Sequence, residues 1–414
     1  MLQKPRGTQD FFLDETKLWI KVETKLREIL NKFNYSEIRT PMFESKELFI
    51  RSIGSTSDIV SKEMYEFVDK KNRSLVLKPE GTASVVRAVV ENKLYAEDYL
   101  PFKTYYISPM FRYERPQNGR YRQFHQLGIE VYGSDSIQQD YEVLNIANNI
   151  INDFKLNKNI KIYTNYLITG KNREQYILEL KKYLTDFKLC TDCNIRIEKN
   201  PLRVLDCKID DKQFNNVPSM KDFLTDEEQK RYQQTLDLFK EMNISTIHDD
   251  KLVRGLDYYT GFIFEIKYES KNIEQTIIAG GRYNNLVYEI GNINLPACGF
   301  GMGLERFINI IKEQNNKLNK NDQSIDLYTI CLDQSAIKLN QQILELSRSI
   351  GLISDSNYYN LSLKSALKKS DKLNPKYLII LGEKEATSNQ FIIKNKINKT
   401  EIKTTLTNFV NDLK

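Results

Sequence analysis

Apolar residues recur every three or four positions in several stretches of the chain, and this spacing predicts amphipathic helices. The first such helix has an apolar face made of Trp19, Val22, Leu26, Ile29, Leu30 and Phe33. By the same pattern we expect helices over residues 15–33, 83–92, 138–154, 174–187 and 226–242. Asp14 or Thr16 is the expected N-cap of the first helix.

Other stretches have the pattern of strands. Tyr105–Tyr113 and Phe124–Tyr132 flank a loop, Arg115–Arg120, that contains Pro and Asn-Gly turn residues. This arrangement predicts a β-hairpin. Glu37–Pro41 is expected to be a short strand ended by proline. Further strands are expected from Leu75, from Leu252 and from Ala297, the last opening into a helix.

The polar segment Gln314–Ser324 predicts a linker and therefore a domain boundary. After it we expect strands over residues 327–332, 377–381 and 390–394, helices over 336–350 and 361–370, and a turn over 382–385. This alternation is typical of an α/β domain. We accordingly divide the chain into residues 1–325 and 326–414, with a mostly helical insertion over residues 169–247.

Composition places the chain among globular proteins, because 40% of its 414 residues are hydrophobic and 28% are charged. No apolar run approaches the roughly 18 residues of a membrane span. The N-terminus lacks the apolar core of a signal peptide, so we expect a cytoplasmic protein that is not bound to a membrane. The net charge of +6 is compatible with a nucleic-acid partner without requiring one.

Five cysteines in a chain without a signal peptide favour reduced thiols. Cys190 and Cys193, followed by Cys207, have the spacing of metal ligands. A structural zinc site normally needs four ligands, and neither His125 nor His248 lies near these cysteines in sequence. We therefore expect no bound zinc.

The predicted hairpin concentrates positive charge near its tip, at Arg112, Arg115, Arg120 and Arg122. Guanidinium groups bind phosphate oxygens in pairs, so one interpretation is a clamp for a polyphosphate. The alternative is a solvated basic hairpin whose charges are balanced by residues such as Glu114.

Three further segments allow two interpretations each. Glu80 and Thr82 follow a strand and either begin the next helix or bind an ammonium group. The stretch Val253–Glu265 is either an edge strand with stacked tyrosines or part of a binding site. The Gly-rich junction Ala297–Arg306 is either a phosphate site or a place of close packing.

A family resemblance bears on these choices. Phe111-Arg-Tyr-Glu-Arg115 resembles motif 2 of class II aminoacyl-tRNA synthetases, and the continuation through Leu127-Gly-Ile-Glu130 is similar to histidyl-tRNA synthetases. The helix over 15–33 and the strand to Pro41 resemble motif 1, and Ala297–Arg306 resembles motif 3. Val253–Glu265 and Ala279–Tyr283 resemble the family's histidine-binding segments, although Asn284-Asn285 stands where the family usually has Asp-Gly.

The resemblance implies an α+β fold with an antiparallel class II catalytic sheet, a helical insertion and a C-terminal α/β anticodon-binding domain. It implies a homodimer formed through motif 1. The implied reaction joins L-histidine to ATP, with Mg²⁺ assisting, and then transfers the histidyl group from the adenylate to histidine tRNA.

The resemblance also implies residue roles. Arg112 and Arg254 would be catalytic at the α-phosphate. ATP would be bound by Arg112, Glu114, Arg120 and Arg306. Histidine would be bound by Glu80, Gly81, Thr82, Gln126, Glu130, Tyr258 and Tyr259, with Glu130 accepting from the imidazole and Tyr259 donating to it. Arg115 and Gln117 would meet the tRNA acceptor end. No metal ligand is assigned.

An alternative function follows from the same resemblance. Some related proteins do not aminoacylate and serve as regulatory subunits in histidine biosynthesis, but they lack the C-terminal domain and core residues. Residues 326–414 are present here, as are Arg112, Glu130, Arg254 and Arg306. We therefore expect the active ligase.

Overall fold

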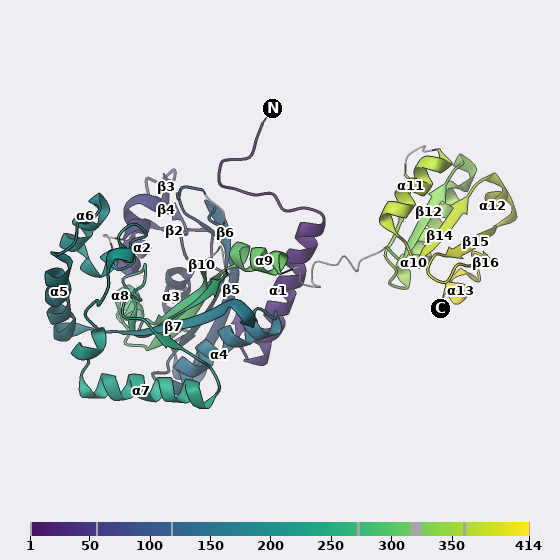
Figure 1. The fold of residues 1–414 in the computed structure, drawn as a ribbon. Helices are drawn as coiled ribbons and strands as arrows, with labels where there is room; N and C mark the ends of the chain where they lie inside the picture. Colours follow the sequence, from purple (N-terminus) through teal and green to yellow (C-terminus); the bar gives the residue numbers. More distant parts are fainter. Residues whose placement is uncertain are drawn as a thin grey trace. The chain divides into compact units, whose positions relative to one another are not determined.

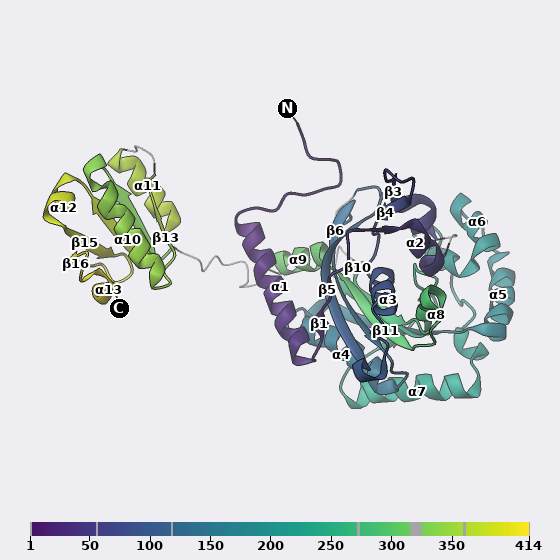
Figure 2. The ribbon, with the colours of Figure 1, turned by 180° about the vertical axis from the view of Figure 1, so that it is seen from behind.

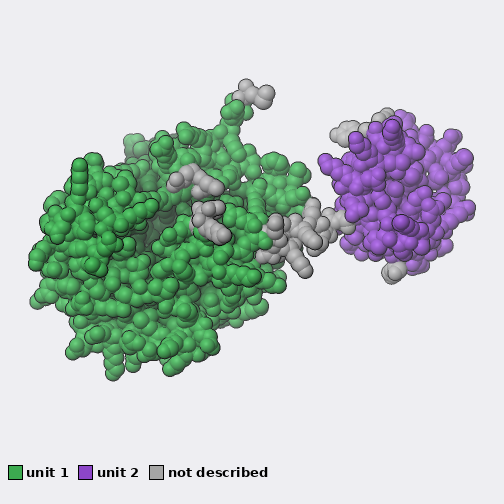
Figure 3. Space-filling model, viewed as in Figure 1, with its two compact units in different colours: residues 1–319 green, residues 320–414 purple. Residues whose placement is uncertain are grey.

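The computed structural model describes residues 2–54, 57–116, 119–270, 274–314, 325–358 and 362–413. The chain divides into two compact units, residues 1–319 and 320–414 (Figure 3). The expected linker, Gln314–Ser324, lies outside the described residues except for Gln314. Each unit is described by itself.

Unit 1 is built on an eight-stranded sheet with the order β1-β5-β6-β11-β10-β9-β7-β8 (Figure 1). Its strands are β1 (Ser36–Glu37), β5 (Phe102–Phe111), β6 (Gln123–Tyr132), β7 (Ile160–Leu167), β8 (Ile247–His248), β9 (Thr260–Glu269), β10 (Glu274–Arg282) and β11 (Ala297–Gly303). The pairs are antiparallel except for β1 with β5 and β7 with β8. The predicted hairpin is therefore present, as β5 and β6.

Side chains alternate between the two faces of this sheet, and each face is covered by helices (Figure 2). On one face, α1 (Asp14–Lys32), α4 (Ile137–Asp153) and α9 (Leu304–Glu313) share a core with Leu127, Ile129 and Val131 of β6. On the other, α3 (Thr82–Glu91) and α8 (Leu286–Gly291) share a core with Tyr106 and Met110 of β5.

A smaller, three-stranded sheet precedes the segment that contains Glu80. It has the order β2-β4-β3, formed by β2 (Phe43–Ser45), β3 (Tyr65–Val68) and β4 (Ser74–Leu77), and α2 (Lys46–Ile53) follows β2. Strand β4 ends just before Glu80, so the chain turns there into α3.

Residues 169–247, the predicted helical insertion, contain α5 (Gly170–Leu184), α6 (Thr191–Lys199) and α7 (Asp226–Glu241), together with short 3-10 turns η4 (Pro201–Val204), η5 (Asp211–Gln213) and η6 (Met220–Phe223). Helices α5 and α6 and the turns surround a core that includes Tyr176, Leu180, Val204 and Phe214 and that extends to Leu167 of β7 and Ile263 of β9. Helix α7 instead places Tyr232 and Phe239 in the core of the main sheet.

Unit 2 has a five-stranded sheet in the order β13-β12-β14-β15-β16. Its strands are β12 (Leu327–Cys331), β13 (Ser354–Ser356), β14 (Tyr377–Leu381), β15 (Gln390–Asn395) and β16 (Thr400–Thr405), and its helices are α10 (Ile337–Ser349), α11 (Leu363–Leu373), α12 (Glu383–Ser388) and α13 (Phe409–Leu413). The strands β13, β12 and β14 are parallel, whereas β15 and β16 add antiparallel pairs.

Four local predictions were wrong. The strand predicted over Glu37–Pro41 covers only Ser36–Glu37. The N-cap of α1 is Leu13, not Asp14 or Thr16. Strand β9 begins at Thr260 and not at Leu252, because the intervening residues form irregular turns. Residues 383–388 form helix α12 and not a turn, since the Glu385 carboxylate accepts a hydrogen bond from the Gly382 N–H at 2.8 Å. Among the described residues, no helix is both long and apolar enough to cross a membrane.

Candidate active site

A polar cleft of about 320 Å³ opens where the β5–β6 loop, strands β9 to β11 and helix α9 meet. Four of the predicted arginines line it: Arg112, Arg120, Arg254 and Arg306. They come from three segments that are far apart in sequence. The cleft therefore gathers the positive charge that the sequence distributes among motif 2, the Arg254 loop and motif 3.

Backbone carbonyls position two of these arginines. Arg112 donates from Nε to the Pro79 carbonyl at 2.8 Å, and its guanidinium lies 5.4 Å from the centre of the Phe124 ring. Arg306 donates to the carbonyls of Gly119 at 3.1 Å and Thr276 at 3.0 Å. Because carbonyls orient a guanidinium without neutralising it, both side chains keep their full charge for an anionic ligand.

The other two arginines are paired with carboxylates. Arg120 lies 3.0 Å from Glu114, and Arg254 forms an ion pair with Glu265, which also accepts a hydrogen bond from Thr276 at 2.9 Å. Burial and then the nearby charge of Arg120 lower the pKa of Arg306. The smaller contribution, from Arg120, is a repulsion between neighbouring positive charges that a bound polyanion would relieve.

Two buried polar atoms beside the cleft have no hydrogen-bond partner among the described residues. One is Nε of Arg254, and the other is Oε1 of Gln126. Both residues line the cleft. Since a buried polar atom without a partner costs roughly 1–3 kcal/mol, a ligand that satisfies these atoms would be bound more tightly for that reason.

A second polar cluster lies at the start of α3. The Glu80 carboxylate accepts hydrogen bonds from the backbone N–H groups of Thr82 at 2.7 Å and Ala83 at 2.8 Å, so it satisfies the N-terminus of the helix. Burial raises the pKa of Glu80, and these two backbone hydrogen bonds, followed by the positive charge of Arg112, oppose that rise. Gly81, the N-cap of α3, packs against Tyr106, where an added Cβ would lie 2.2 Å from a ring atom.

Glu130 joins this cluster to the tyrosines of the Arg254 loop. Its carboxylate accepts hydrogen bonds from Thr82 at 2.7 Å and from the hydroxyl of Tyr283. Burial raises the pKa of Glu130 to about 8. The Tyr283 ring contacts Tyr258, whose ring is tilted against that of Tyr259 with 4.8 Å between ring centres, and Arg254 lies over the Tyr259 ring.

The glycines of β11 make room for two of these side chains. An added Cβ at Gly299 would lie 2.3 Å from a Glu130 carboxylate oxygen, and one at Gly301 would lie 2.1 Å from the Gln126 amide nitrogen. Strand β11 pairs with β6, which carries both side chains. Close approach of polar side chains, and not only close packing, therefore explains the Gly-rich strand.

The predicted site residues thus fall into three groups. Gln126, Glu114 and the four arginines line the cleft, while Glu80, Thr82, Glu130, Tyr258 and Tyr259 form the adjoining cluster. Arg115 is exposed and does not line the cleft. Gln117 lies outside the described residues.

Sequence reasoning missed three cleft or cluster residues and one cysteine neighbour. Asp206 and Glu265 line the cleft, and Tyr283 hydrogen-bonds Glu130. Tyr283 stands in a segment that the resemblance singled out, so that signal was available. Asp210 lies with Cys190, Cys193 and Cys207, so the premise that these cysteines lack a fourth partner was wrong.

The antiparallel sheet, the arginine-lined cleft and the three motif segments around it define a class II aminoacyl-tRNA synthetase. The family model described as "Histidyl-tRNA synthetase" matches residues 7–164 and 210–307. The chain therefore belongs to the histidyl-tRNA synthetase family. It is an enzyme that charges tRNA with histidine and uses ATP as a substrate.

Individual relatives agree with this assignment. The chain is 99% identical over 414 residues, covering all of both proteins, to the Histidine--tRNA ligase of Mycoplasma capricolum subsp. capricolum, and 84% identical over the same length to that of Mycoplasma mycoides subsp. mycoides. The apo histidyl-tRNA synthetase of S. aureus is similar to it with a TM-score of 0.83 at 32% identity, covering all of both chains. These full-length likenesses do not favour the regulatory-subunit alternative.

Proposed function

We propose that the cleft binds ATP beside histidine and forms histidyl-adenylate between Arg112 and Arg254. The observation that carries this proposal is the convergence of four arginines on one cleft. The attacking carboxylate belongs to histidine, so the protein needs no nucleophile. It positions the two reactants and offsets the negative charge that develops at the α-phosphate.

Arg112 contacts the α-phosphate from the side of β5, and Arg254 contacts it from the opposite side, near the histidine carboxylate. Arg120 and Arg306 hold the outgoing phosphates, and Glu114 orients the nucleotide through its ion pair with Arg120. The carboxylates of Glu114, Asp206 and Glu265 line the cleft and offer the oxygen ligands that Mg²⁺ prefers. Bound with ATP, Mg²⁺ would supply further neutralisation of phosphate charge.

The adjoining cluster recognises histidine. Neutral imidazole presents an N–H donor and a bare nitrogen acceptor on one flat ring. Glu130 accepts from the donor, the Tyr259 hydroxyl donates to the acceptor, and Gln126 and Tyr258 form the walls. Glu80, with Gly81 and Thr82, binds the α-ammonium group. An amino acid without those ring nitrogens leaves buried groups unpaired, which can reject a competitor by about 10⁴–10⁵-fold.

Two regions bind the tRNA. The loop after β5 meets the acceptor end, through Arg115 and Gln117. Residues 326–414 form the anticodon-binding domain. Support comes from the exposure of Arg115 outside the cleft, which leaves it free for an external ligand, and from the separate core of unit 2.

The enzyme acts as a homodimer in the cytoplasm. Motif 1 supplies the dimer contact, and support comes from large apolar side chains that are exposed at or next to it: Phe12, Leu13, Ile20, Met42 and Phe43. Large apolar side chains exposed together can mark an interface.

ATP–pyrophosphate exchange, measured with each amino acid in turn, tests the proposed site. We expect exchange with histidine alone. Equal exchange with another amino acid would contradict the assigned pocket, and no exchange with histidine would contradict the adenylation proposal.

A further inference from the structure

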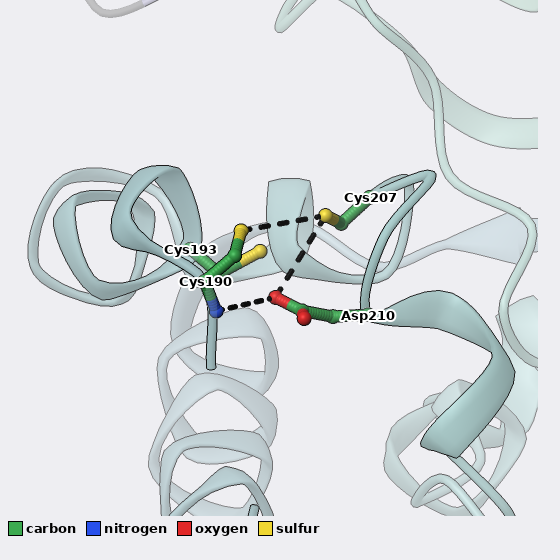
Figure 4. A group of neighbouring side chains, drawn as sticks. All are labelled: Cys190, Cys193, Cys207 and Asp210. Atoms are coloured by element: carbon green, nitrogen blue, oxygen red, sulfur yellow. Dashed lines mark hydrogen bonds between the residues drawn. The ribbon is translucent and has the colours of Figure 1, made fainter. Parts of the chain in front are cut away.

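A second cluster of reactive side chains lies in the insertion, apart from the arginine cleft (Figure 4). Cys190 precedes α6, Cys193 lies in its first turn, and Cys207 and Asp210 follow η4. One ligand atom from each of the four residues lies within 4.8 Å of all the others. The family model does not match residues 165–209, which include the three cysteines.

The spacing of these atoms fits a tetrahedral ion. Cys207 Sγ lies 3.8 Å from Cys190 Sγ and 3.8 Å from a carboxylate oxygen of Asp210. Zn–S bonds of about 2.3 Å at tetrahedral angles separate two sulfurs by about 3.8 Å. The four groups therefore need little rearrangement to coordinate one zinc ion.

Burial and hydrogen bonding make the Asp210 carboxylate a suitable ligand for a cation. Asp210 is only 4% exposed, and Cys193 and Cys207 are also buried. Among the described residues, the donors to the Asp210 carboxylate are the Cys190 backbone N–H at 3.0 Å and the thiols of the three cysteines. Thiols are weak donors, so a cation would interact with this carboxylate more strongly than the thiols do.

We propose that Cys190, Cys193, Cys207 and Asp210 bind one Zn²⁺ ion in a closed structural site. The three thiols lose their protons to solvent as the ion binds, and the sulfurs and one carboxylate oxygen become its four ligands. The four anionic ligands exceed the charge of the ion. Arg196 follows Cys193 by three residues in α6, so the two side chains share one face of the helix and the arginine charge can offset part of the excess, although it also pairs with Asp58 at 2.7 Å.

The site would stabilise a segment that reaches the arginine cleft. Asp206, next to Cys207, lines that cleft. Arg203 lies 3.2 Å from Asp257, which belongs to the loop that carries Arg254. A bound ion would therefore hold α6, η4 and η5 against the loop that carries Arg254. This role is structural, and zinc binding itself does not depend on the residue roles proposed for adenylation.

The test is metal analysis of the full-length protein, purified without chelators and passed through gel filtration. We expect one zinc per chain. Cys207→Ser should lower the zinc affinity by at least the roughly 10–100-fold that loss of an outer-shell partner costs. Cys331→Ser is the matched control, because Cys331 lies in unit 2, outside the cluster, and its substitution should leave the zinc content unchanged.

Two further measurements exclude a trivial loss of zinc through unfolding. Asp210→Asn keeps the side-chain shape and should also weaken zinc binding, with an unchanged circular dichroism spectrum. Protein reconstituted with Co²⁺ should show the intense absorption of tetrahedral thiolate coordination, and Cys207→Ser should abolish it. Wild-type protein that retains no zinc after incubation with ZnCl₂, zinc that is retained equally by Cys207→Ser, or a Cys190–Cys207 disulfide in the purified protein would each overturn the proposal.

Discussion

Thr82 donates its hydroxyl to the Glu130 carboxylate at 2.7 Å, so the first residue of α3 and the C-terminal part of β6 share one buried hydrogen bond. The same Thr82 donates its backbone N–H to Glu80. The two carboxylates assigned to opposite ends of histidine are therefore connected through one residue. A change at either end is expected to affect the position of the other.

Replacing the Glu130 carboxylate tests its assignment to the imidazole. Glu130→Gln keeps the shape but cannot give up a proton to become the carboxylate that accepts strongly from the imidazole N–H when histidine binds. We expect kcat/KM for histidine to fall by about 10–100-fold, the effect of one unpaired buried polar group. Pyrophosphate exchange measures this effect, and the KM for ATP should be unchanged. An equal rise in both KM values would indicate a general disturbance of the cleft.

The raised pKa of Glu130 predicts a pH dependence of stability. Burial raises this pKa from 4.5 to about 8, so the folded protein holds a proton that the unfolded chain releases. The stabilising contribution of the protonated group is complete below pH 4.5 and is lost as the pH rises through about 8. The free energy of unfolding should fall by up to about 1.4 kcal/mol per pH unit in that window.

Comparison with Glu130→Gln isolates this effect from other groups, such as Asp140, whose pKa burial raises to about 6. Urea unfolding of both proteins across the window should give a difference that shrinks toward low pH. A difference that does not depend on pH would mean that Glu130 is ionised throughout.

Arg254 is proposed to stabilise the transition state more than it stabilises the bound substrate. Arg254→Ala should lower the rate of adenylate formation far more than it weakens histidine binding, because its charge matters most as charge develops at phosphorus. Single-turnover kinetics and equilibrium binding separate the two effects. Arg51→Ala, at an exposed pair on α2, is a control that should change neither. If only the histidine KM rose, Arg254 would be a ground-state ligand.

The elements that could be predicted from the sequence are those that a local residue pattern determines. The spacing of apolar residues predicted helix α1, and two strand-like stretches around turn residues predicted the β5–β6 hairpin. The motif arginines were identified from the family resemblance. Asp206 and Asp210 were missed because the residues around them in the structure lie far away in the sequence or form no recognisable sequence pattern. The late start of β9 was missed because Arg254, Asp257 and Tyr258 are held by side chains from other elements, as in the Arg203–Asp257 pair, and not by strand pairing.

Arg115 should matter for tRNA and not for adenylation. It is exposed and lies outside the cleft lining, so Arg115→Ala should leave pyrophosphate exchange unchanged. Charging should be slower, with a higher KM for tRNA and a weaker dependence on salt, because a phosphate or base contact is lost. Loss of exchange in this variant would place Arg115 in the nucleotide site.

Removal of residues 326–414 separates recognition of the tRNA acceptor end from recognition of the anticodon. Unit 2 has its own core, which includes Leu327, Ile343, Ile379 and Phe391, whereas the arginine cleft and the Glu130 cluster lie wholly within unit 1. Adenylate formation should therefore survive the truncation. Charging should fall steeply, because the remaining protein keeps only acceptor-end contacts and loses the RNA contacts of the C-terminal domain.

Pyrophosphate exchange and tRNA charging should be measured on one preparation whose oligomeric state is matched to that of the full chain. Charging at full efficiency would show that residues 326–414 are not the anticodon-binding domain. Loss of both activities from a folded protein of unchanged oligomeric state would instead mean that unit 2 helps to order the catalytic site.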